Sequence, residues 1–289
     1  MTIATPKAIT RTPAERLADR KFFVGLARAF GGAVLFSLPL LMTMEMWWLG
    51  FYLDRVKLLL FMVLMIPVVV ALDYFSGFEE TASWREDLMD GMIAYGVGLV
   101  ASVVILLLFG IVDFEQPLRE VVGKVAIQSV PASFGAVLAN SQLAGNGDGD
   151  GAETRRKEEA GYGGKLFIMT AGAVFLAFNV APTEEMILIS FVMSSWHALA
   201  LMAASLLMMH GFVYASEFRG SPRVAHGTPM WSLFLRNTVV GYVIALAVSA
   251  YVLWTFGRLE HGVPHSYVMM TLVLGFPAAL GAAAARLII

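Results

Sequence analysis

The chain contains no cysteine among its 289 residues. This absence excludes disulfide bonds, thiolate metal sites and cysteine nucleophiles. Charge is also scarce, because Asp, Glu, Lys and Arg together make up 15% of the residues and the formal net charge is −2. About one quarter of the residues of an average soluble domain are charged. With so few charges and no basic arm, the sequence excludes a nucleic-acid-binding protein.

Hydrophobic residues are abundant, at 58% of the chain, and the mean hydropathy is +0.73. A helix needs about 20 apolar residues to cross a bilayer. Eight segments meet this requirement, at residues 28–49, 57–75, 91–112, 121–140, 165–183, 192–215, 233–256 and 267–288. The sequence therefore predicts an all-α membrane protein with eight transmembrane helices.

The first and fifth predicted spans carry the same motif. A Gly-Ala-Val run at 32–34 is followed by Thr43-x-Glu45-Met46, and 140 residues later the run at 172–174 is followed by Thr183-x-Glu185-Met186. The fourth span is repeated too, since Pro131 and Gly135 recur 146 residues later as Pro277 and Gly281. Because each repeat has an even number of helices, we expect two tandem parallel four-helix repeats around a pseudo-two-fold axis along the membrane normal.

Basic residues flanking the spans predict the orientation of the chain. They gather near the N-terminus, around Arg155, and near Arg219 and Arg286, and are fewer on the opposite side. By the positive-inside rule, both termini are expected in the cytoplasm. We expect an N-terminal cytoplasmic segment at 1–27, membrane repeats at 28–143 and 165–289, and a Gly- and Asp-rich flexible linker at 144–164.

The repeated glutamates are the leading candidates for function. Counting along the first span places Glu45 in the outer third of the bilayer, and Glu185 is expected at the same depth. An ionisable residue inside a membrane marks a functional site by default, and rings of carboxylates serve cation channels. We therefore predict an ion pathway or selectivity site formed by Glu45, Glu185, Thr43, Thr183, Glu184 and Asn179. The alternative is that these residues stabilise interfacial helix ends.

Two other polar residues lie within predicted spans. Lys124 is expected to pair with a glutamate or to extend towards the membrane surface. His210 is expected to be a packed, hydrogen-bonded residue. No histidine or carboxylate spacing fits a metal site, and no convergent acid and base set indicates an enzyme, so we predict no metal, no cofactor and no enzymatic activity.

The two Thr-x-Glu-Met helices and the Pro-Ala-x-x-Gly-Ala fourth helices resemble a family of uncharacterised bacterial integral membrane proteins, a domain of unknown function. This resemblance implies a prokaryotic inner-membrane location and no particular activity. The first span also resembles the opening helix of the lysosomal and bacterial potassium-channel family that carries a Phe-Ser-Asp motif. Here Phe30 is followed by Gly31 and Gly32 in place of the Ser and Asp.

We expect an ion channel, conducting an inorganic cation, in the inner membrane of a bacterium. Two glutamates per chain would form a ring of four in a dimer, so a homo-oligomer embedded in the lipid bilayer is expected. A proton- or cation-coupled secondary transporter is the first alternative. A membrane sensor or assembly subunit without transport activity is the second.

Overall fold

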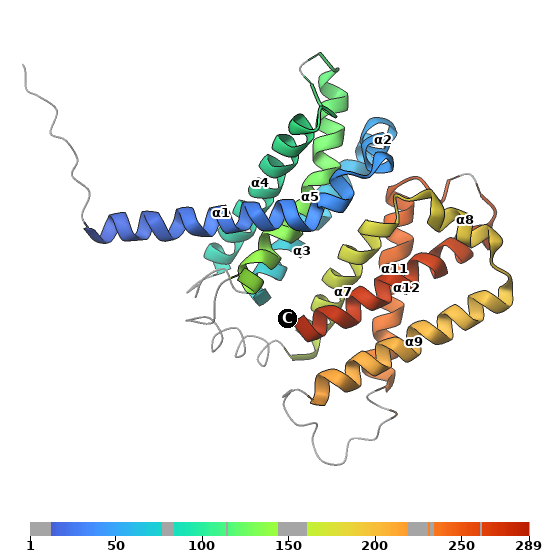
Figure 1. Ribbon diagram of the computed structural model, residues 1–289. Coiled ribbons are helices and arrows are strands. Elements are labelled where there is room, and N and C mark those ends of the chain that lie inside the picture. Colours follow the sequence, from blue (N-terminus) through green and yellow to red (C-terminus); the bar gives the residue numbers. More distant parts are fainter. Residues whose placement is uncertain are drawn as a thin grey trace, which may run out of the picture.

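The computed structural model describes residues 13–76, 84–113, 115–143, 161–218, 231, 234–260 and 262–288, and no strand occurs in these ranges. Eight helices among them are long and apolar enough to cross a membrane, as predicted. Helices suit this environment because every backbone polar group in lipid must be satisfied inside the protein. The chain is an all-α membrane protein (Figure 1).

The helices fall into two halves along the chain. The first half contains α1 (Pro13–Leu41), α2 (Met44–Tyr52), α3 (Arg55–Ser76), α4 (Trp84–Leu108) and α5 (Leu118–Leu143). The second half contains α7 (Gly161–Val180), α8 (Glu184–Val192), α9 (Ser195–Phe218), the π-helix η1 (Phe234–Val239), α11 (Val240–Thr255) and α12 (Pro264–Ile288).

The predicted first span, 28–49, was wrong at its C-terminal end. The helix ends at Leu41, Thr43 adopts an extended backbone with φ −89° and ψ 117°, and α2 then begins at Met44. The predicted fifth span, 165–183, is likewise too long, because α7 ends at Val180. Apolar sequence continues past both helix ends, so hydropathy alone does not reveal them.

Helical structure reaches into the predicted N-terminal segment and into the predicted linker. Helix α1 begins at Pro13, within the predicted N-terminal segment 1–27. Residues 144–160 of the predicted linker lie outside the described residues, and 161–164 form the first turn of α7. Gly161 starts that helix with a φ of +57°, a conformation that glycine adopts without a steric penalty.

Each half is built around a close crossing of its first and last long helices. In the first half, Gly32 of α1 lies against Gly135 and Ala139 of α5, so closely that a Cβ atom on Gly32 would collide with both. In the second half, Gly172 of α7 lies in the same way against Gly281 of α12. Small residues allow such close approach between membrane helices, where packing replaces the hydrophobic effect.

The helix pairs in contact correspond from one half to the other. Helix α1 packs most extensively on α5, and α7 on α12; likewise α4 packs on α5, and α11 on α12. The Gly crossings have the 140- and 146-residue offsets read from the sequence. The parallel arrangement of the repeats and the cytoplasmic position of both termini remain predictions.

Aromatic rings fill the surface between the halves. Phe61 of α3 stacks on Phe178 of α7 with ring centroids 5.1 Å apart, and Phe178 meets Phe256 edge-on at 5.1 Å. Phe175 of α7 lies 6.1 Å from Phe36 and 6.3 Å from Phe134. Each such pair contributes about 0.5–1.5 kcal/mol beyond the burial of its area. The halves therefore meet through packing of rings.

A charged contact closes one end of this surface. The Lys57 ammonium group donates to the carbonyl oxygen of Trp254 at 3.1 Å and lies 4.8 Å from the centre of its indole ring. It also forms an ion pair with Glu260. These contacts link the start of α3 to the segment between α11 and α12.

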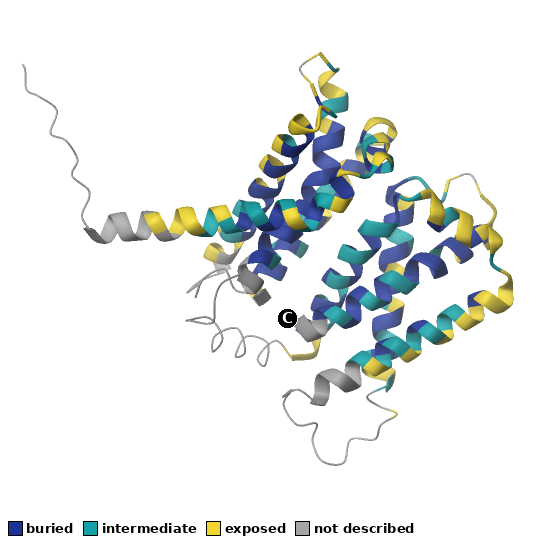
Figure 2. Cartoon of the chain, viewed as in Figure 1, coloured by how far each residue is buried: buried dark blue, intermediate teal, exposed yellow. Residues whose placement is uncertain are grey.

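Helix α5 lies at the centre of the first half (Figure 2). Of its membrane span, 83% is buried, against 17% for the span in α9. A polar side chain on α5 is therefore shielded by protein, whereas much of α9 is exposed on the surface of the chain. This burial makes α5 the element on which polar residues most need partners.

We predict that Gly32→Ala destabilises the protein by about 1–3 kcal/mol, the usual cost of overpacking a close contact. Gly31→Ala is the matched control, since a Cβ atom there would meet nothing within 4 Å. Thermal unfolding in detergent micelles, followed by circular dichroism, would compare them. Equal melting temperatures for the two variants would contradict the glycine crossing.

Candidate functional site at two helix breaks

The break between α1 and α2 is closed by hydrogen bonds from Thr43. Its hydroxyl group donates to the carbonyl oxygen of Pro39 at 2.5 Å, and its backbone N–H donates to Leu40 at 3.0 Å. The last carbonyl groups of a helix have no partner within the helix and need one from elsewhere. Thr43 thus completes the end of α1.

Two further side chains satisfy the same helix end. The indole N–H of Trp47 donates to the carbonyl oxygen of Leu41 at 2.8 Å. The side-chain amide of Gln128, on α5, donates to the carbonyl oxygen of Leu40 at 3.1 Å. Side chains of α2 and α5 therefore stabilise the break between helices α1 and α2.

The break between α7 and α8 is closed by different residues. Thr183 donates its hydroxyl proton to Val180 at 2.9 Å, and Arg258 donates to the carbonyl oxygen of Pro182 at 2.7 Å. The Asn179 side chain donates to Phe175, one turn back in α7, at 2.7 Å. The guanidinium group of Arg258 thus donates to a backbone carbonyl group at this break, as the side-chain amide of Gln128 does at the break in the first half.

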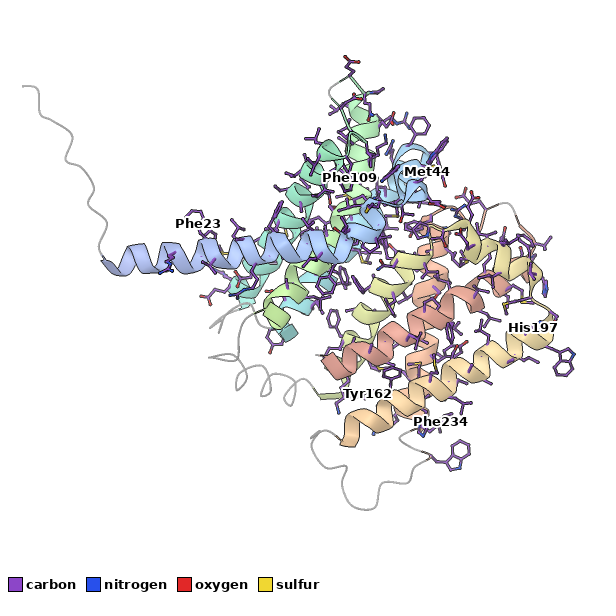
Figure 3. All side chains as sticks on the ribbon, in the orientation of Figure 1. Phe23, Met44, Phe109, Tyr162, His197 and Phe234 are labelled. Carbon is purple, nitrogen blue, oxygen red and sulfur yellow. The ribbon has the colours of Figure 1, made fainter. Side chains whose placement is uncertain are left out.

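Both repeated glutamates lie in the first turn of a short helix. Thr43 and Thr183 are the N-caps of α2 and α8, so Glu45 and Glu185 each occupy the second helical position. A carboxylate there is stabilised by the positive end of the helix dipole. Figure 3 places Met44, the neighbour of Glu45, at the same end of the first half as Phe109.

The carboxylate groups remain available to a ligand. Glu45 is partly exposed and Glu184 and Glu185 are exposed. Within the described ranges, none of the three side-chain carboxylate groups has a hydrogen bond or an ion pair. The first candidate membrane span is the helix that ends at Leu41, so Glu45 lies on the next helix, α2, and its depth in the bilayer stays a prediction.

Each glutamate belongs to its own half. Helix α2 packs mainly on α5, and α8 packs on α12. The surface between the halves holds the aromatic rings around Phe61 and Phe178. The structure therefore brings each glutamate next to its own threonine, and it packs each of the two short helices on the last long helix of its own half.

Comparison with known proteins identifies the family. The model of the family described as "Putative integral membrane protein (DUF2391)" matches residues 25–289. The chain belongs to this family. No curated protein and no solved structure matches the chain. The likeness to the potassium-channel family thus gains no support, whereas the resemblance to an uncharacterised family of multi-pass membrane proteins is confirmed.

The DUF2391 match covers both helix breaks and the buried lysine of α5. Lys124 forms an ion pair with Glu120, one turn before it, at 2.5 Å. Its ammonium group also donates to the carbonyl oxygen of Ile111 at 3.2 Å and to the side chain of Gln116 at 3.4 Å. The prediction that Lys124 pairs with a glutamate is confirmed.

His210 of this DUF2391 protein is packed and hydrogen-bonded, as predicted. Its Nδ1 atom lies 3.2 Å from the hydroxyl oxygen of Thr238 on η1, and its ring meets Phe234 edge-on at 5.3 Å. Among the residues that the structure describes, no group of three or more His, Asp or Glu side chains could hold a metal ion.

Sequence reasoning missed Gln128 and Arg258 as residues that hold the helix breaks. Gln128 had a signal, because an amide in an apolar helix needs a hydrogen-bonding partner. Nothing in the sequence marked Arg258 as a stabilising residue, apart from its place at the end of a span. Their partners, Leu40 and Pro182, are far away in the sequence, so only the packing of the helices reveals the contacts.

We predict that Thr43→Val lowers the free energy of unfolding by about 0.5–1.5 kcal/mol, since valine has the same shape but donates no hydrogen bond. Thr43→Ser keeps the hydroxyl group and should unfold close to the native temperature. Thermal unfolding in micelles measures both. If Thr43→Val were as stable as the native protein, the hydroxyl group would have no part in closing α1.

Proposed function

We propose that this integral membrane protein is a cation-conducting channel with carboxylates at the entrance of its pathway. One observation carries the proposal: the same carboxylate occupies the same helical position after the same kind of helix break in both halves, at Glu45 and Glu185. A helix end needs no carboxylate at that position. Its recurrence supports a task that both halves share.

The free carboxylate oxygens support binding of a cation. Rings of Asp or Glu in channels replace part of the hydration shell of a cation and raise its local concentration. Glu184 adds a second exposed carboxylate beside Glu185.

The polar residues near the glutamates supply further oxygen atoms. Thr43 and Thr183 donate their hydroxyl protons to carbonyl groups, but each hydroxyl oxygen keeps lone pairs that can accept. The side-chain oxygen of Asn179 is an acceptor as well, because only its amide nitrogen donates to Phe175. We assign these residues to the lining of the entrance.

The position of the breaks favours a channel over a coupled transporter. Secondary transporters bind their substrates near the membrane midplane, between the parts of discontinuous helices. Here α1 and α7 are each one continuous helix over the candidate spans Phe22–Leu41 and Gly161–Val180, and the short helices α2 and α8 that carry the glutamates follow them. We propose that the carboxylates line an entrance and do not form a central carrier site.

The proposed pathway involves more than one copy of the chain. Phe61, Phe178 and Phe256 are 0–2% exposed and fill the surface between the two halves of one copy, which leaves that surface apolar. Two copies in a bacterial inner membrane, with both termini in the cytoplasm, would supply four glutamates to one entrance. We place the pathway at this homo-oligomeric assembly.

We predict that Glu45→Gln and Glu185→Gln each lower cation flux into proteoliposomes about tenfold or more, because the local cation concentration falls. Glu115→Gln is the matched control, since Glu115 is an exposed carboxylate between α4 and α5, outside the two motifs. Fluxes of K⁺, Na⁺ and H⁺ are measured with ion-sensitive dyes.

Unchanged flux and selectivity in both glutamine variants would refute the proposal. Saturable, pH-coupled uptake without single-channel currents in planar bilayers would instead identify a secondary transporter. Measurement of thermal unfolding on the same samples separates loss of conduction from loss of folding.

A further inference from the structure

A row of polar side chains runs into the core along one face of α5. Glu120, Lys124 and Gln128 follow one another at one-turn spacing, starting in the first turn of the helix. Their burial rises along the row: the side chain of Glu120 is 22% exposed and that of Lys124 10% exposed, and Gln128 as a whole residue is 0% exposed. The row therefore leads from the helix start to a fully enclosed amide.

The second half shows that the fold does not need this row. The positions 146 residues later on α12 hold Ser266, Met270 and Leu274. Met270 is 4% exposed and Leu274 is 0% exposed, so apolar side chains fill the corresponding sites. The crossings of Gly32 with Gly135 and of Gly172 with Gly281 support this register. The polar residues are thus a property of the first half alone.

The hydrogen bonds along the row are satisfied except at its end. Lys124 has three acceptors, on Glu120, Ile111 and Gln116. The Gln128 amide nitrogen donates to Leu40, but its side-chain oxygen is buried and receives no hydrogen bond from any residue in the described ranges. A buried acceptor without a donor costs about 1–3 kcal/mol, which leucine at this site would avoid.

The missing donor is best supplied by water. A bound metal cation is disfavoured, because the Lys124 ammonium group lies one turn away and the Leu40 carbonyl oxygen already accepts two hydrogen bonds. Buried water forms two to four hydrogen bonds with polar groups that the protein leaves unsatisfied. A neutral donor thus fits the charge and the polarity of the site.

Helix α2 covers the outer part of the row. Gly50 lies directly against the backbone of Gly123 and Lys124. Trp47 packs in the apolar cluster around Leu41 and Val125, and it also holds the end of α1. Helix α2, which carries Glu45 in its first turn, therefore lies over the polar row.

We propose that water enters the first half along Glu120 and Lys124 and hydrogen-bonds to the side-chain oxygen of Gln128, and that the second half has no such path. The two halves then differ in function although they share one packing scheme. This hydration site is independent of cation conduction.

The natural absence of cysteine makes the test direct. Gln128→Cys and its counterpart Leu274→Cys each introduce one thiol into the full-length chain, reconstituted in lipid vesicles. Ag⁺, a small thiol-reactive ion that travels through water, is added in chloride-free buffer. Thiols that remain free are then labelled with a maleimide after denaturation.

We expect Ag⁺ to protect the thiol at position 128 from the maleimide at a rate about tenfold or more above that for the thiol at 274. The reason is that the site at 274 must open before water and Ag⁺ reach it, whereas the site at 128 is already hydrated. Equal rates would overturn the proposal. Since no ion flux is measured, failure here leaves the channel proposal untouched, and failure of the channel proposal leaves this result standing.

A second variant tests the route. Lys124→Met, added to Gln128→Cys, puts in the row the methionine that stands at the corresponding position 270. This double variant should lower the protection rate to that of Leu274→Cys. Protection that stays fast would overturn the proposed entry along Lys124. If Gln128→Cys does not fold, the pair Lys124→Cys and Met270→Cys gives the same comparison one turn nearer the entrance, with equal rates again refuting it.

Discussion

The structure depends on one constraint: a backbone carbonyl or amide group inside a membrane must find its partner within the protein. The long helices meet this constraint by themselves, but the ends of α1 and α7 do not. Thr43, Trp47 and Gln128 satisfy the first end. Thr183 and Arg258 satisfy the second. The placement of both short helices, and with them the repeated glutamates, follows from these bonds.

The spans, the helical class and the family could be predicted from the sequence because hydropathy and repeated motifs report them directly. The helix ends could not. The sequence from Met44 to Tyr52 is as apolar as the span before it, so no polar boundary marks the break after Leu41. The motif Thr-x-Glu-Met was recognised, but its meaning as an N-cap followed by the first turn of a new helix required the backbone conformation.

Contacts between residues far apart in the sequence could not be predicted either. Phe61 and Phe178 carry no signal of mutual contact, since each reads as an ordinary apolar residue of a span. The sequence shows the run at 32–34 and Gly135 only as parts of the repeat, and the structure places Gly32 and Gly135 at one crossing. The repeated motifs of the candidate site are visible in the sequence, whereas the residues on α5 and after α11 that hold the helix breaks depend on tertiary packing.

The glycine crossings have a consequence for how the protein is made. Gly32 meets Gly135, so the main packing contact of the first half closes within the first 143 residues, before any residue of α7 is needed. The second half closes in the same way between Gly172 and Gly281. During synthesis, each half can fold as a unit in the order of translation. The two folded halves can then associate through the aromatic surface around Phe61 and Phe178. The last step of folding is in that case the association of two helix bundles within one chain.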